Sequence, residues 1–161
     1  MAVFMTHILS HWSHHFPFWN MSSDGFYRQV DEVIKSHGIP EITVKRVKHK
    51  EKGIFSASRE YLQVQHRDLV FDICASPYGR DFFVSWWLYE SEDGLRIFLK
   101  HTKVGDFLDA RAAKRTFLEA DKEALFKSCI HSCILETIAM LTQEQSHRLS
   151  DLERQIHIAR I

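Results

Sequence analysis

One short stretch near the middle of the chain restricts the possible folds more than any other feature. Residues 82–89 alternate between two sets of side chains that would lie on opposite faces of a β-strand. Both sets are mainly apolar: Phe82, Val84, Trp86 and Leu88 on one face, and Phe83, Ser85, Trp87 and Tyr89 on the other. A strand with two apolar faces belongs in a sheet that is covered on both sides, so we expect helices or a partner to cover each face.

The rest of the chain predicts an α+β domain around this strand. Residues 41–101 alternate in a strand-like way between turn sequences, with a last strand at 95–99, and such short connections join only antiparallel neighbours. Residues 1–40 are aromatic and histidine-rich and then helical, and residues 113–161 have helical spacing. We expect an antiparallel four- to five-stranded meander sheet packed by N- and C-terminal helices, in one domain covering residues 1–161.

Capping residues give approximate bounds to the helices. Helices are expected over residues 23–37 and 116–141, and a short one from residue 150, because serine, aspartate or threonine oxygens precede each apolar-periodic segment. Residues 4–16 are expected to form a further short helix, with large apolar side chains at every fourth position. A break in the alternation near Arg46 suggests a β-bulge.

The N-terminal histidines are the first candidate site. His7, His11 and His15 are four residues apart, and imidazoles at this spacing on a helix can chelate a divalent ion. Ile8 stands where a zinc protease would carry its glutamate, so that hydrolytic motif is absent. Two interpretations stay open: a divalent-metal site, or histidines that pack beside Trp12 or face water. No other cofactor is expected.

Asp72 is the most conspicuous polar residue within an apolar segment. A carboxylate in that position must be paired or lie on a hydrated face, and we expect Arg80 or Arg96 to pair with it. A role as a general base would need a neighbouring acid or histidine such as His66. The structural role is the favoured interpretation.

One basic segment offers a possible contact with phosphate groups. Its cationic residues are Lys45, Arg46, Lys48, Lys50 and Lys52. Tyr61, Trp87 or Tyr89 would supply the stacking surface of a nucleic-acid site. Lysines that protect an edge strand from aggregation explain the same segment. We favour the edge strand, because 21 basic residues against 21 acidic ones leave no net positive charge to attract nucleic acid.

Cysteine content and hydropathy suggest a compartment. The three cysteines are an odd number, which argues against a disulfide framework and for a reducing environment. The first residues lack the basic region of a secretory signal, and no run of about 18 apolar residues is present. We expect a cytoplasmic protein without a transmembrane segment.

Several short segments together resemble a group of uncharacterised bacterial hypothetical proteins. They are Arg59-Glu-Tyr-Leu, Phe71-Asp-Ile-Cys-Ala, Pro77-Tyr-Gly, Phe82-Phe-Val-Ser-Trp-Trp-Leu, Ala120-Asp-Lys-Glu-Ala-Leu-Phe, His131 and Leu149-Ser-Asp-Leu-Glu-Arg. The resemblance covers about two-thirds of the chain and implies a bacterial origin and one integrated domain. It brings no assigned activity and no catalytic residues.

The sequence favours a non-catalytic function. Nucleophile elbows, phosphate-binding glycine loops and informatively spaced carboxylate pairs are missing, and the chain has only six glycines. The leading hypothesis is a binding or accessory module that binds a protein partner or a second copy of itself. Its contact residues would be Phe83, Trp87, Tyr89 and Phe98.

Two alternatives remain. One is a small metal-dependent hydrolase or nuclease that uses His7, His11 and His15, with Asp72 as a further candidate. The other is nucleic-acid binding through the basic segment.

Overall fold

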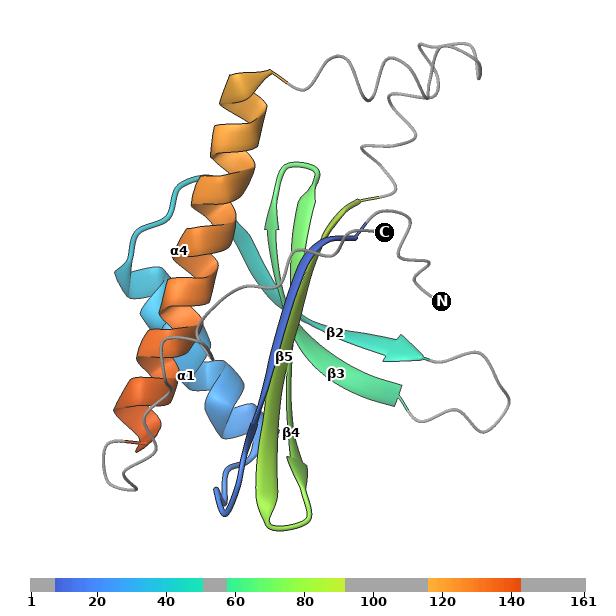
Figure 1. Cartoon of the computed structure of the whole chain (residues 1–161), viewed down its shortest axis with the longest axis vertical. Helices are drawn as coiled ribbons and strands as arrows, with labels where there is room; N and C mark the ends of the chain where they lie inside the picture. Colours follow the sequence, from blue (N-terminus) through green and yellow to red (C-terminus); the bar gives the residue numbers. More distant parts are fainter. Residues whose placement is uncertain (1–7, 51–57, 92–115, 143–161) are drawn as a thin grey trace.

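The structure, a computed structural model, describes residues 8–50, 58–91 and 116–142 (Figure 1). Its elements in chain order are β1 (Ile8–Phe16), α1 (Ser23–Ser36), β2 (Thr43–Lys50), β3 (Ser58–His66), β4 (Leu69–Tyr78), β5 (Asp81–Glu90) and α4 (Phe117–Thr142). The expected strand at 95–99 and the expected helix from residue 150 lie outside these residues.

Five strands form one antiparallel sheet in the order β1-β5-β4-β3-β2. Strands β2 to β5 form the expected meander, because each pairs with the next along the chain. Strand β1 joins the sheet on the far side of β5 and supplies the fifth strand. The prediction of an antiparallel sheet packed by an N-terminal and a C-terminal helix is confirmed.

Residues 8–16 are a strand, so the expected helix over residues 4–16 is wrong for this part of it. Trp12 and Phe16 pair across the sheet with Trp86 and Phe82. A separation of four residues keeps two side chains on one face of a helix and also on one face of a strand, since four is an even number. The apolar spacing therefore fitted both structures, and pairing with the apolar strand β5 favours the strand.

The pairing of β2 with β3 also differs from expectation. It is regular from Thr43 opposite Gln65 to Lys50 opposite Ser58, so the predicted bulge near Arg46 is absent. The irregular position lies in β1, between Ile8 and Ser10.

Both helices begin with the predicted caps. The Ser22 hydroxyl accepts a hydrogen bond from the Gly25 amide at 3.1 Å, at the start of α1. At the start of α4, the Glu119 amide donates to Thr116 Oγ1 at 3.2 Å, and Glu119 Oε2 accepts from the Thr116 amide at 3.1 Å. This reciprocal pair is the capping box that the sequence predicted.

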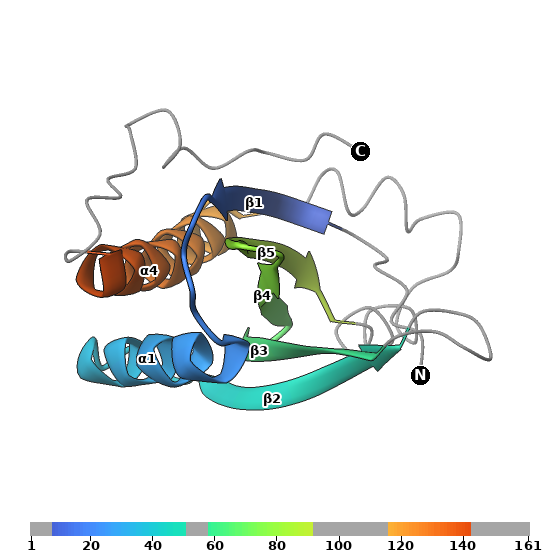
Figure 2. The same cartoon turned by 90° about the horizontal axis from the view of Figure 1, so that it is seen from below.

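Helices α1 and α4 pack on the same face of the sheet (Figure 2). Phe71, Trp86, Ile130 and Ile134 are fully buried between the helices and the sheet. Trp86 also donates from its indole nitrogen to Nδ1 of the buried His131 on α4 at 3.0 Å. The indole N–H can only donate, so Nδ1 of His131 is the acceptor and carries no proton in this arrangement.

We call the opposite face of the sheet the helix-free face, because none of the described helices covers it (Figure 2). Of the two expected kinds of cover, the described helices supply one face only, and cover of the other face by a partner stays a prediction. The centre of this face is nevertheless closed to solvent, since Val70, Asp72, Cys74 and Ser85 are each at most 5% exposed.

By length and composition alone, helix α4 could cross a membrane. The sequence did not lead us to expect this. A helix buried in a domain core can meet the same measure. In the structure one side of α4 packs on the sheet through Phe126, Ile130 and Ile134, whereas Leu125 and Met140 are exposed.

Tyr27 of α1 opens the sheet between β3 and β4. The direct pairing of these strands ends at Leu62 and Ile73, and its continuation would place Glu60 opposite Ala75. Instead, the Tyr27 hydroxyl accepts from the Ala75 amide and donates to the Glu60 carbonyl oxygen, both at 2.8 Å. Beyond this point the β2–β3 pair diverges from β4 and β5 (Figure 1).

We predict that Tyr27→Phe destabilises the protein by about 2 kcal/mol, because the buried Ala75 amide and the partly buried Glu60 carbonyl lose their hydrogen-bond partner. Urea denaturation of the variant measures this loss. Tyr78→Phe is the matched control, since Tyr78 is 79% exposed, and it should change stability by less than about 0.5 kcal/mol. Equal stability of the two variants would contradict the assigned role of the Tyr27 hydroxyl.

Candidate functional site

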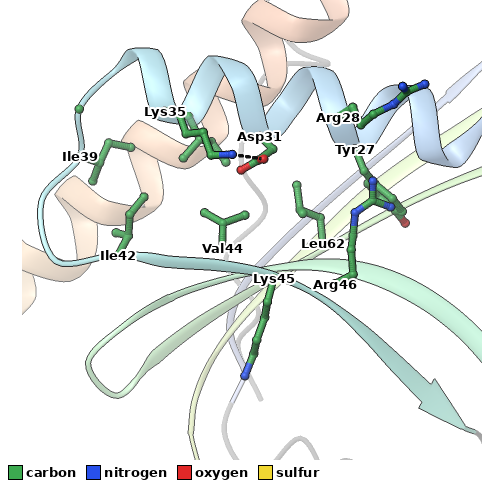
Figure 3. A pocket seen from close by; sticks show the side chains of 12 residues that line it. Tyr27, Arg28, Asp31, Lys35, Ile39, Ile42, Val44, Lys45, Arg46 and Leu62 are labelled. Atoms are coloured by element: carbon green, nitrogen blue, oxygen red, sulfur yellow. Dashed lines mark hydrogen bonds and ion pairs between the residues drawn. The ribbon is translucent and has the colours of Figure 1, made fainter.

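A groove of about 550 Å³ lies between α1 and β2 (Figure 3). Its apolar lining consists of Ile34 from α1, Ile39 and Ile42 from the connection, Val44 from β2 and Leu62 from β3. Ile34 and Leu62 belong to the core, and the other three are partly buried against it. The groove is therefore an open extension of the hydrophobic core at the border of the sheet.

The turn after α1 places the two walls of the groove beside each other. The chain reverses at Gly38, whose φ of 59° lies in the left-handed region that glycine adopts readily. Ile39 and Ile42 follow this turn and direct apolar side chains into the groove before β2 begins (Figure 3). Helix α1 is also tied to α4 by the His37–Glu136 pair, at 2.7 Å.

Most of the charged residues that line the groove form ion pairs, and Lys45 is the exception among the described ones. Lys35 pairs with Asp31 at 2.6 Å within α1. Arg46 lies over the Tyr27 ring, 4.6 Å from its centroid, and pairs with Asp24 and Glu60 at 3.2 Å each. The rim therefore shields the apolar lining without presenting a strong field of either sign.

The predicted basic segment lies on β2, which is an edge strand of the sheet. Arg46 points toward α1, whereas Lys45 points away from the groove, as alternation along a strand requires (Figure 3). Lys45 and Lys48 are exposed, and neither has an ion-pair partner among the described residues. The side chain of Lys50 and the whole of Lys52 lie outside the described part, so phosphate contacts of this segment stay a prediction.

Asp72 is the centre of a buried polar cluster on the helix-free face. Its carboxylate accepts hydrogen bonds from Gln63 Nε2 at 2.9 Å, Tyr89 Oη at 2.7 Å and His49 Nε2 at 2.9 Å. Burial and the charge of Asp72 raise the pKa of the Tyr89 hydroxyl above its usual range. The hydroxyl is thus a donor at any pH at which the protein would be studied.

The partners of Asp72 differ from the expected ones. The expectation of Arg80 is wrong, since Gln63, Tyr89 and His49 make the contacts, and Arg96 lies outside the described residues. His66 does not join the cluster: its ring packs against Phe126 on the side of the helices.

The cluster connects four adjacent strands through one carboxylate. His49, Gln63, Asp72 and Tyr89 come from β2, β3, β4 and β5 respectively. Three donors satisfy both carboxylate oxygens, which is what a buried charge requires. We conclude that Asp72 has the structural role that the sequence favoured, with a different set of partners.

The histidines of β1 have separate partners. His11 stacks on Trp87 with ring centroids 3.9 Å apart, and its Nδ1 lies 3.1 Å from the Trp86 carbonyl oxygen. His15 Nε2 contacts Asp81 at 2.7 Å. The Phe18 amide and then His15 lower the pKa of Asp81 by hydrogen bonding.

A strand separates residues four apart by about 13 Å, too far for two imidazoles to share one ion. Across residues 8–50, 58–91 and 116–142, no three histidine, cysteine, aspartate or glutamate side chains form a potential metal site. His7 lies outside these ranges, so a metal site that includes it stays a prediction.

The predicted partner-binding residues have unequal exposure. Phe83 and Trp87 are half-buried on the helix-free face, opposite His15 and His11 of β1. Tyr89 is only 6% exposed and its hydroxyl donates a hydrogen bond to Asp72, so it presents little surface to a partner. Phe98 lies outside the described residues. Binding through these aromatic side chains stays a prediction.

The two buried cysteine thiols are not activated nucleophiles. Burial raises the pKa of Cys74, although the nearby Arg59 lowers it in part. Burial also raises the pKa of Cys133 to about 11. Both thiols therefore behave as small apolar groups near neutral pH.

Sequence reasoning missed the groove, His49 and Gln63. Gln63 could have been found, because the hairpin that pairs His66 with Leu69 places residue 63 opposite residue 72. His49 and the groove depend on the pairing of β2 and on the position of α1, and no short sequence pattern indicates either of these.

We predict that Asp72→Ala destabilises the protein by about 3 kcal/mol or more, because it leaves the Gln63 amide and the Tyr89 hydroxyl buried without an acceptor. Asp72→Asn retains one acceptor oxygen and should have a smaller effect in the same urea titration. Asp121→Ala, at an exposed position in α4, should cost at most about 1 kcal/mol. Wild-type stability of both Asp72 variants would show that this carboxylate does not hold the four strands together.

Comparisons with protein-family models, curated proteins and solved structures find no match to this chain. The resemblance to uncharacterised bacterial proteins therefore stays a prediction.

Proposed function

We propose that the protein is a non-catalytic binding module that holds an extended segment of a protein partner in the groove between α1 and β2. The observation that carries this proposal is a groove, with isoleucine, valine and leucine side chains in its lining and charged side chains around them, that opens at an edge strand. Recognition of extended peptides commonly combines these two features, since the edge offers backbone hydrogen bonds and the groove accepts side chains.

The lining of the groove supports binding by apolar contact. Ile39, Ile42 and Val44 are partly buried, so a ligand side chain placed against them removes further apolar surface from water. The neighbouring cations Arg28, Lys35 and Arg46 already have carboxylate partners. Their pairing favours an apolar occupant of the groove over an anion.

The walls of the groove are held in place before any ligand binds. Tyr27 anchors α1 to the backbone of β3 and β4, and Arg46 connects β2 with both Asp24 and Glu60. Such preorganisation lowers the entropy lost when a ligand binds.

The test is an NMR titration with a neutral six-residue peptide of alternating valine and threonine. We expect shift changes of the amides of Ile39, Ile42 and Val44 that saturate with peptide concentration. Ile39→Trp, which fills the groove, should weaken binding at least tenfold. Leu125→Trp is the matched control, because Leu125 is 67% exposed on α4, away from the groove.

Two results would contradict the proposal. One is the absence of shift changes at millimolar peptide. The other is a set of changes around Phe83 and Trp87 instead, which would place the binding surface on the helix-free face. Sedimentation in the same buffer tests for binding between two copies of the chain, the other partner that the sequence suggested.

A further inference from the structure

The outer edge of β2 can accept one more strand. In the described part of the chain, β2 pairs with β3 alone and ends the sheet. Alternate peptide groups of an edge strand point outward and are available for hydrogen bonding. Val44 and Arg46 face α1, so an added strand would lie along the groove with every second side chain directed toward it (Figure 3).

Two cations of β2 near this edge differ in their pairing: Arg46 on the groove side forms ion pairs, whereas Lys45 on the helix-free side forms none in the described part. Lys45 has no carboxylate partner among the described residues, and Arg59 forms no ion pair with them, although its guanidinium donates a weak hydrogen bond to Cys74 Sγ at 3.9 Å. Lys48 shares the groove side of β2 with Arg46 by strand alternation, and it is exposed and forms no ion pair with the described residues.

The acidic groups near these cations are already occupied. Asp72, the buried carboxylate on the helix-free side, accepts three hydrogen bonds. Glu60 and Asp24 are held by Arg46 on the other side of the strand. A ligand with carboxylates on the helix-free side would therefore meet cations that no described group neutralises.

We infer that the groove takes an acidic extended peptide that adds to β2 as a sixth strand. This inference rests on the proposed function and specifies its partner. The apolar side chains of the peptide enter the groove, and the alternate carboxylates face Lys45 on the other side. The partner segment is thus a strand that alternates apolar and acidic residues.

The lysines of β2 also explain how the edge avoids indiscriminate pairing. Exposed lysines protect edge strands because a neutral or basic strand that approaches them must leave their charges unpaired or repelled. A strand that carries carboxylates at the matching positions removes this penalty. The same side chains that oppose aggregation therefore select an acidic partner.

The test compares six-residue peptides in which valine alternates with glutamate, threonine or lysine, by calorimetry at low ionic strength. We expect the glutamate peptide to bind at least fivefold more tightly than the threonine peptide, and the lysine peptide to bind most weakly. Increasing the salt concentration should reduce the difference, since exposed charges are screened. Methylation of the peptide's backbone nitrogens that would face β2 should weaken the binding of the glutamate peptide at least tenfold.

Charge reversal on the protein provides the second arm. Lys45→Glu should invert the order, with the lysine peptide now binding more tightly than the glutamate peptide. Lys122→Glu is the matched control, because Lys122 is exposed on α4, and it should leave the order unchanged.

Equal binding of the glutamate and threonine peptides, or an unchanged order in Lys45→Glu, would overturn the inference. If both peptides still perturb the groove amides, the proposed binding module survives and only the acidic partner is excluded. Salt-sensitive binding of a single-stranded oligonucleotide to β2, without binding of the glutamate peptide, would also overturn the inference.

Discussion

The packing of both helices against one face of the sheet determines most of the properties of this molecule. Phe71 and Trp86 at the centre of that face contact each other, with ring centroids 4.5 Å apart, and α4 covers them with Ile130 and Ile134. Helix α1 lies beside α4 and extends to the border of the sheet, where its side chains and those of β2 leave the groove between them. The other face receives no described helix and buries its charge through hydrogen bonds within the sheet.

Local patterns were sufficient to predict much of the fold. The capping residues of α1 and α4 and the tight hairpin after His66 depend on a few neighbouring residues, and each was found at the expected position. The fold class followed from the short connections, because these can join only antiparallel strands.

The predictions that were wrong concern features that depend on distant residues, or apolar spacings that fit a helix and a strand equally well. Trp12 and Phe16 fit one face of a helix as well as one face of a strand, and only the partner strand β5 distinguishes the two. The prediction for Asp72 had the right physical requirement, that a buried carboxylate needs partners. Of the actual partners, Gln63 follows from the local hairpin of β3 and β4, whereas His49 depends on the position of β2 relative to β4, which is not encoded locally.

The charges of the chain balance overall, yet their distribution is uneven. On the groove side of β2, Arg46 forms ion pairs with Asp24 and Glu60, whereas Lys45 on the opposite side forms none in the described part. A net charge of zero therefore hides a local field along one edge of the sheet. The binding properties proposed above follow from this local asymmetry.

Tyr27 takes part in two separate features of the molecule. It replaces a direct bond between two strands, and the same side chain lines the groove. The divergence of the β2–β3 pair from β4 and β5 and the shape of the groove beside α1 thus both depend on the Tyr27 side chain. A substitution at this position therefore acts on the junction of β3 with β4 and on the lining of the groove at the same time.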